Sequence, residues 1–164
     1  MPILAAHSME VISRSADQTR RVGMRLGALL QPGDLVCLVG DLGSGKTTLM
    51  QGIGAGWGSL DQVSSPTFVI INVYRRPGDQ TLYHLDAYRL TGAEEAIDLD
   101  LDALLAGAPM VVEWADRIEK ALPAECLRVR LTYVDEDQRD MMIEAIGARS
   151  QALLAKLRKA VYGG

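Results

Sequence analysis

One glycine-rich segment constrains the fold of this chain more than any other feature of its sequence. Residues 40–47, Gly-Asp-Leu-Gly-Ser-Gly-Lys-Thr, match the phosphate-binding pattern G-x-x-x-x-G-K-[S/T] in full. An apolar run at residues 35–39 leads into the segment, and residues 47–51 continue it with helical character. Such a loop needs a strand before it and a helix after it, and the sequence indicates both. We therefore expect an α/β sheet that is parallel at its centre.

The residue types in this loop suit a chain of phosphate groups. Glycines at 40, 43 and 45 let the backbone wrap so that successive N–H groups point toward one anion. The loop ends at a helix N-terminus, which favours negative charge. Lys46 is expected to contact the β- and γ-phosphates, and the Thr47 hydroxyl to bind Mg²⁺. The predicted nucleotide-binding residues are Asp41, Leu42, Gly43, Ser44, Gly45, Lys46, Thr47 and Thr48.

The length and composition favour one globular domain. The chain has 164 residues, 48% of them hydrophobic and 23% charged, which suffices for a sizeable core. Its net charge of −4 argues against a protein built to coat nucleic acid. No apolar run approaches the roughly 18 residues of a membrane span, and residues 1–8 do not resemble a signal peptide. We therefore expect a single domain over residues 1–164, soluble and cytoplasmic, with Cys37 and Cys126 as buried free thiols.

Apolar patterning and turn signals predict the remaining elements. Two pairs of β-rich runs are each separated by a polar turn, and each pair is expected to form an antiparallel hairpin. The fold class is therefore α/β, a three-layer fold like that of P-loop NTPases, in which antiparallel hairpin strands extend a parallel centre. Helices are expected from residue 15 to about 30, from 46 to before 58, and at 93–105, 118–122 and 150–161. Strands are expected at 35–39, 68–74, 81–85, 110–112, 127–133 and 141–146.

Two carboxylates are placed to complete a phosphate site. Asp86 follows the strand-like residues 82–85, and Glu113 follows the apolar residues 110–112. Ligands of open α/β sheets bind where parallel strands end. One carboxylate is expected to hold Mg²⁺ and the other to orient or deprotonate the attacking water, with the assignment of roles left open. The alternative is that one of the two is a solvated turn residue.

Other polar and aromatic residues carry a weaker signal. The hydroxyls of Ser65 and Thr67, between the loop helix and the first hairpin, are placed to reach the γ-phosphate as a switch, although Ser-Pro-Thr is also common at turns. Trp114, next to Glu113, either shapes the site or belongs to the core. His84 lies between apolar residues, which favours a core or hydrogen-bonded histidine over a ligand.

Four segments, taken together, resemble the TsaE (YjeE) family, the small bacterial ATPases of tRNA threonylcarbamoyladenosine biosynthesis. They occur in the family's order and spacing within about residues 10 to 150. Each of the later segments is weak alone, and the ordered set is specific. The segments are residues 40–48, 65–68 (Ser-Pro-Thr-Phe), 84–90 (His-Leu-Asp-Ala-Tyr-Arg-Leu) and 113–114 (Glu-Trp).

The resemblance implies a function that the spacing of residues does not show. The family hydrolyses ATP with Mg²⁺ and works with two partners, TsaB and TsaD. TsaD transfers the threonylcarbamoyl group to adenosine in tRNA, and the ATPase resets that assembly between turnovers. By position, the resemblance places phosphate and Mg²⁺ binding at Lys46 and Thr47, the metal at Glu113, water or metal at Asp86, the switch at Ser65 and Thr67, and a functional aromatic at Trp114.

Two other functions are compatible with the phosphate loop. A small-molecule kinase would need an acceptor pocket and an arginine-bearing lid, for which only Arg75, Arg76 and Arg89 are central candidates. A nucleotide-gated binding switch would use the loop with hydrolysis incidental. The sequence contains no guanine-reading Asn-Lys-x-Asp motif, which favours ATP over GTP.

Overall fold

The protein is built on a seven-stranded sheet with the strand order β1-β7-β6-β2-β5-β4-β3. The computed structural model describes residues 7–41, 43–63, 71–90 and 93–163. The strands are β1 (Ser8–Ser13), β2 (Leu35–Val39), β3 (Ile71–Arg76), β4 (Gln80–Asp86), β5 (Met110–Glu113), β6 (Cys126–Tyr133) and β7 (Arg139–Ile146).

The sheet is parallel at its centre and antiparallel toward both edges, which confirms the expected fold class. Strand β2 pairs in parallel with both β5 and β6, and β5 pairs in parallel with β4. The hairpins β3–β4 and β6–β7 are antiparallel, and β1 adds antiparallel to β7. All five residues of β2 are buried, as is typical of a strand covered on both faces.

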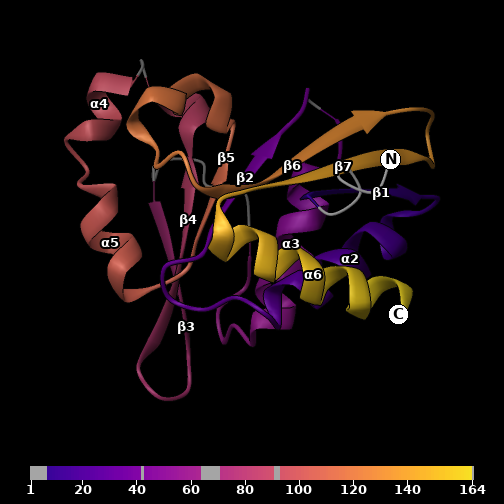
Figure 1. Cartoon of the computed structure of the whole chain (residues 1–164), viewed down its shortest axis with the longest axis horizontal. Coiled ribbons are helices and arrows are strands. Elements are labelled where there is room, and N and C mark those ends of the chain that lie inside the picture. The colour runs from indigo at the N-terminus through magenta and orange to yellow at the C-terminus, as the bar shows by residue number, and fades with distance from the viewer. Residues whose placement is uncertain (1–6, 42, 64–70, 91–92, 164) are drawn as a thin grey trace.

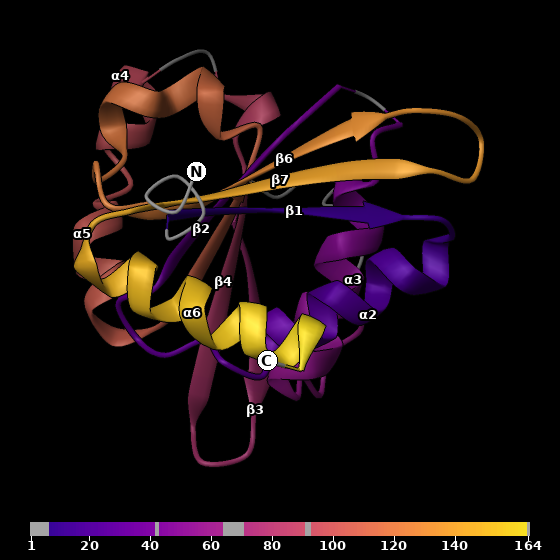
Figure 2. The ribbon, with the colours of Figure 1, turned by 45° about the vertical axis from the view of Figure 1, so that its right-hand side comes forward.

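Helices cover both faces of the sheet and complete three layers. Figures 1 and 2 show α4 and α5 on the opposite side of the sheet from α2, α3 and α6. None of the helices in the described ranges is long and apolar enough to cross a lipid bilayer. The helices are α2 (Ala16–Gly27), α3 (Lys46–Trp57), α4 (Ala93–Ile97), α5 (Leu101–Gly107) and α6 (Ala148–Tyr162), with the 3₁₀ helices η1 (Ala87–Arg89) and η2 (Ala115–Ala121).

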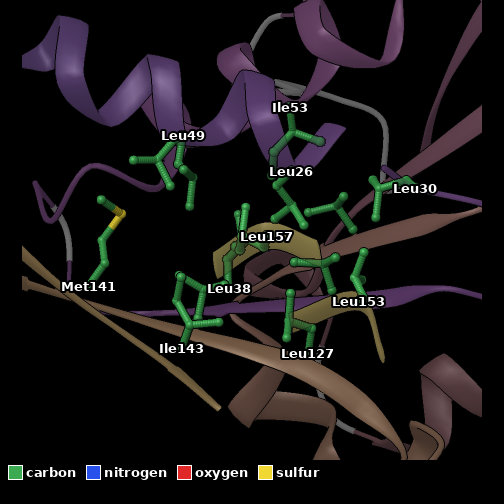
Figure 3. Packing of buried hydrophobic residues seen from close by; sticks show 14 of the residues in the cluster. Leu26, Leu30, Leu38, Leu49, Ile53, Leu127, Met141, Ile143, Leu153 and Leu157 are labelled. Atoms are coloured by element: carbon green, nitrogen blue, oxygen red, sulfur yellow. The ribbon is translucent and has the colours of Figure 1, made fainter. Parts of the chain in front are cut away.

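Alternation along β2 divides the core into two clusters. Val36 and Leu38 belong to the cluster on the face covered by α2, α3 and α6. Figure 3 shows Leu38 among leucines of those helices and Ile53 of α3. Leu35, Cys37 and Val39 point to the other face, which α4, α5 and η2 cover. Because successive side chains of a strand point to opposite faces, one short apolar strand supplies both cores.

The two cysteines confirm the expected free, buried thiols and lie on neighbouring strands. The hydrogen bond with Cys126, followed by burial, raises the pKa of Cys37. The same hydrogen bond, with help from the charge of Arg128, lowers the pKa of Cys126 to about 7.

The structure departs from the expected elements in two places. Strand β1 was not expected, although its burial alternates, with Met9, Val11 and Ser13 inside. The expected helix at 93–105 is two helices, since α4 ends at Ile97 and Asp100, directly before α5, adopts a left-handed backbone (φ 53°) that a continuous helix excludes. Residues 68–70 of the expected first hairpin strand lie outside the described residues.

The helix that follows the glycine loop packs unusually close to α2. A Cβ atom built at Gly52 or Gly56 of α3 would overlap a backbone carbonyl oxygen of α2, at Arg20 and Met24 respectively. The relation is reciprocal, because glycines of α2 meet the backbone of α3 in the same way. These glycines lower helix propensity, and the close backbone contact is the structural reason for them.

Replacing Gly56 with alanine should therefore destabilise the protein. The added methyl group has no space and must push the two helices apart, so we expect Gly56→Ala to lower the free energy of unfolding by about 1–3 kcal/mol. Gly107→Ala is the matched control, since a Cβ there meets nothing within 4 Å; it should leave stability unchanged or raise it by up to about 1 kcal/mol. Urea unfolding followed by circular dichroism measures both, and equal stabilities would contradict the packing argument.

Candidate functional site

The glycine loop connects the end of β2 to the start of α3. Gly43 and Gly45 have backbone φ angles of 80° and 105°, which residues other than glycine rarely adopt, and Gly45 is the residue directly before the helix. The loop therefore folds back over the N-terminus of α3, where unpaired backbone N–H groups are available to an anion. Ser44 is buried beneath the loop, whereas Thr47 is exposed on its outer side.

Lys46 is the buried cation of the site. Its Nζ donates hydrogen bonds to the carbonyl oxygens of Gly40 and Asp41, the latter at 2.8 Å, and lies 4.1 Å from the ring centroid of Trp114. Burial lowers the pKa of the Lys46 ammonium, while nearby carboxylates, Glu113 first among them, act in the opposite direction. The ammonium is thus held on its own loop and under an aromatic ring.

The structure brings both predicted carboxylates to the loop. Asp86 ends β4 and Glu113 ends β5, and the two are direct partners in the parallel register. Glu113 is buried, and Asp86 is half-buried and accepts a hydrogen bond from the backbone N–H of Tyr88 at 3.1 Å. Both line a cleft of about 380 Å³ together with Gly43, Gly45, Lys46, Thr47, Thr48, Tyr88, Trp114 and Arg139.

Trp114 lines this cleft and is not simply part of the core. Its backbone is left-handed (φ 59°, ψ 39°), a strained conformation for a large side chain. Its ring meets the Tyr88 ring at a centroid distance of 5.1 Å, and Tyr88 in turn lies under the guanidinium of Arg117 at 5.3 Å. The geometry therefore favours the site-shaping interpretation of Trp114.

His84 is a hydrogen-bonded histidine, as its place between apolar residues favoured. It lies in β4 on the same face of the sheet as Asp86, two residues before it, and only 1% of it is exposed. Its two ring nitrogens contact Glu113 and Tyr74. No feature of the sequence indicates that Glu113 is one of its partners.

Sequence reasoning missed two cleft residues, Tyr88 and Arg139. Arg139 begins β7, and its guanidinium lies 4.6 Å from the ring centroid of Tyr133. It lines both the main cleft and a smaller neighbouring cavity of about 130 Å³. No local motif marks it, since it reaches the loop only through the β6–β7 hairpin. That smaller cavity is also lined by Ser15, Ala16, Thr19, Gly45, Thr48, Glu136 and Asp137.

Three predicted residues, Leu42, Ser65 and Thr67, lie outside the described residues. Within the described ranges, no group of three or more His, Cys, Asp or Glu side chains is arranged to hold a metal ion. Among the oxygen-bearing side chains that line the cleft are the Thr47 hydroxyl and two carboxylates, Asp86 and Glu113. This small, all-oxygen set fits Mg²⁺, which usually takes one or two carboxylates and completes its shell with phosphate and water.

Fold and site together define an α/β protein in which a glycine loop joins a central parallel strand to a helix and faces two carboxylates from neighbouring strands. The model of one protein family, described as "Threonylcarbamoyl adenosine biosynthesis protein TsaE", matches residues 13–141. The chain belongs to the TsaE family, which confirms the resemblance seen in its sequence motifs.

Similar proteins share most of their length with this chain. A tRNA threonylcarbamoyladenosine biosynthesis protein TsaE from Streptomyces coelicolor is 47% identical over 123 residues, covering 74% of this chain and 83% of the relative. The TsaE protein of Bacillus subtilis is 38% identical over 144 residues, covering 87% and 89% respectively. The crystal structure of YdiB from Bacillus subtilis superposes with a TM-score of 0.77 at 32% identity, covering 93% of this chain and 95% of that one.

The contact between Lys46 and Trp114 predicts an optical signal. The chain has two tryptophans, so Trp57→Phe leaves Trp114 as the only one. A phosphate chain that draws the Lys46 ammonium away from the indole ring removes a cation from its face. We expect ATP to change the Trp114 emission in this background, as measured by fluorescence titration. With Lys46→Met added, ATP should leave the emission unchanged; a persisting change would contradict the assignment.

Proposed function

We propose that this chain is an Mg²⁺-dependent ATPase that supports tRNA threonylcarbamoyladenosine biosynthesis in the cytoplasm together with TsaB and TsaD. One observation carries the proposal: a single cleft unites the glycine loop, with Lys46 and Thr47, and the two strand-end carboxylates Asp86 and Glu113. Phosphoryl transfer depends mainly on positioning and charge neutralisation, and these are the residue types that supply both.

Each part of the cleft has a role in this proposal. The backbone N–H groups of the loop bind the phosphate chain, and Lys46 moves from the loop carbonyls to the β- and γ-phosphates. Thr47 and Glu113 would hold Mg²⁺, whose positive charge would neutralise charge that develops on the phosphate oxygens. Asp86, the more exposed carboxylate, orients the attacking water or supports the metal. Trp114 and Tyr88 form the aromatic wall, and Ser65 and Thr67 act as the switch.

The biological process in this proposal is taken from the names of similar proteins. Proteins from Streptomyces coelicolor and Bacillus subtilis that match most of this chain are named for tRNA threonylcarbamoyladenosine biosynthesis. We extend that role to this chain, and we extend the partners TsaB and TsaD on the same basis. The net charge of −4 supports action on tRNA through these partners, with direct contact absent or weak.

Hydrolysis measurements with two site variants test the proposal. The protein should hydrolyse ATP slowly alone and faster with TsaB and TsaD, because partners that complete the site add transition-state contacts. Glu113→Ala should lower kcat by about 10²- to 10⁴-fold while nucleotide binding is retained, and Lys46→Ala should impair binding as well. Phosphate release and fluorescence titration give the two readouts.

Glu119→Ala is the matched control for Glu113→Ala. Glu119 is an exposed glutamate of η2 that lies away from the cleft and forms an ion pair with Arg128 of β6. Its replacement should therefore leave kcat unchanged. Retention of full activity by Glu113→Ala would contradict the ATPase assignment and favour a nucleotide-gated switch. If TsaB and TsaD leave the rate of ATP hydrolysis unchanged, the proposed role in tRNA threonylcarbamoyladenosine biosynthesis is contradicted. Small-molecule phosphate acceptors are then the substrates to test.

A further inference from the structure

We propose that His84 is a positioning residue that fixes the carboxylate of Glu113 in the cleft. The inference rests on the proposed ATPase function of the cleft and extends it to a residue outside that cleft. His84 is not among the residues that line the cleft, whereas Glu113 is. Any effect of His84 on catalysis must therefore pass through Glu113.

The contact between the two side chains is almost completely buried. The His84 side chain is 1% exposed and that of Glu113 is 8% exposed, and Nε2 of the histidine is hydrogen-bonded to Oε2 of the glutamate. On the opposite side of the ring, Nδ1 of His84 lies 2.9 Å from the hydroxyl oxygen of Tyr74. The rings of Tyr74 and His84 also stack, with centroids 5.8 Å apart and planes at 30°. The imidazole is thus held at both nitrogens and on one face.

The hydrogen bonds that link these side chains can be assigned a consistent donor and acceptor at each step. A carboxylate oxygen only accepts, so Nε2 of His84 carries the proton and donates to Glu113. In the tautomer that carries its single proton on Nε2, Nδ1 accepts, and Tyr74 donates its hydroxyl proton there. The Tyr74 oxygen can in turn accept from Nδ2 of Asn72 at 3.4 Å. Both ring nitrogens of His84 have a partner, and these hydrogen bonds run from β3 through β4 to β5.

The strand pairing makes this chain of hydrogen bonds possible. Asn72 is the direct partner of His84 across the antiparallel β3–β4 pair, and Asp86 is the partner of Glu113 across the parallel β4–β5 pair. A carboxylate held by a buried imidazole loses rotational freedom, so fewer orientations must be given up when Mg²⁺ and nucleotide bind. The strand pairing thereby orients the Glu113 carboxylate toward the loop.

Two substitutions at His84 distinguish a positioning role of its side chain from a purely structural one. The amide nitrogen of glutamine falls near the place of the histidine Nε2 and can still donate to Glu113. The amide nitrogen of asparagine falls near Nδ1 and leaves Glu113 without its partner. We expect His84→Asn to lower kcat by about 10- to 100-fold, the usual effect of removing such a support, with little change in KM for ATP. His84→Gln should restore most of the turnover.

Controls distinguish this effect from a loss of stability. Leu85→Val changes the next residue of β4, which packs on the opposite face of the sheet, so it should lower the melting temperature and leave kcat unchanged. In a Glu113→Gln background, His84→Asn should cause no further loss, because the group it positions is gone. Equal turnover of the asparagine and glutamine variants, or a full additional loss in the Glu113→Gln background, would overturn the inference.

A spectroscopic readout tests the proton arrangement in the protein without nucleotide. The chain contains two histidines, so His7→Gln leaves His84 as the only imidazole. A long-range ¹H–¹⁵N spectrum of this variant should show a proton on Nε2, and an Nε2 without a proton would overturn the inference. If the wild-type protein hydrolyses no ATP, the proposed function fails and the positioning role falls with it. If it does, and His84→Asn turns over normally, only the positioning role fails.

Discussion

The parallel pairing of β2, β5 and β4 is the constraint on which the site depends. These three strands end at one edge of the sheet, so the loop after β2, Glu113 at the end of β5 and Asp86 at the end of β4 converge, although Gly40 and Glu113 are 73 positions apart in sequence. A slip of the β4–β5 pair by one residue would turn Asp86 to the opposite face. Buried apolar residues on both faces of β2 hold that register in place.

The aromatic and charged groups around Lys46 show how one cation is kept in the cleft. Burial disfavours its ammonium, and the carbonyl oxygens of the loop, the Trp114 ring and the carboxylates compensate in part. Trp114 reaches this position only because its backbone is left-handed directly after β5. A catalytic carboxylate and its aromatic neighbour can therefore be adjacent in sequence and still point into the same cleft.

Local patterns were sufficient for the parts of the protein that depend on neighbouring residues. The glycine loop, the two hairpins and the buried strands follow from residue type and periodicity, and so does the meeting of Asp86 with Glu113. The contact of His84 with Glu113 spans 29 positions and depends on strand register, which no short window contains. Arg139 reaches the loop only through the β6–β7 hairpin. Strand β1 gains its partner, β7, from the far end of the chain, which no local pattern indicates.

The close contact of α2 and α3 affects the order in which parts of the protein open. Carbonyl oxygens of each helix lie against the Cα atoms of glycines in the other, so neither helix can unwind without exposing the backbone of both. The two helices therefore form one cooperative unit for amide hydrogen exchange. The helix that carries Lys46 contains several glycines and would fray early in isolation, yet in the folded protein its central amides exchange only when α2 opens with it.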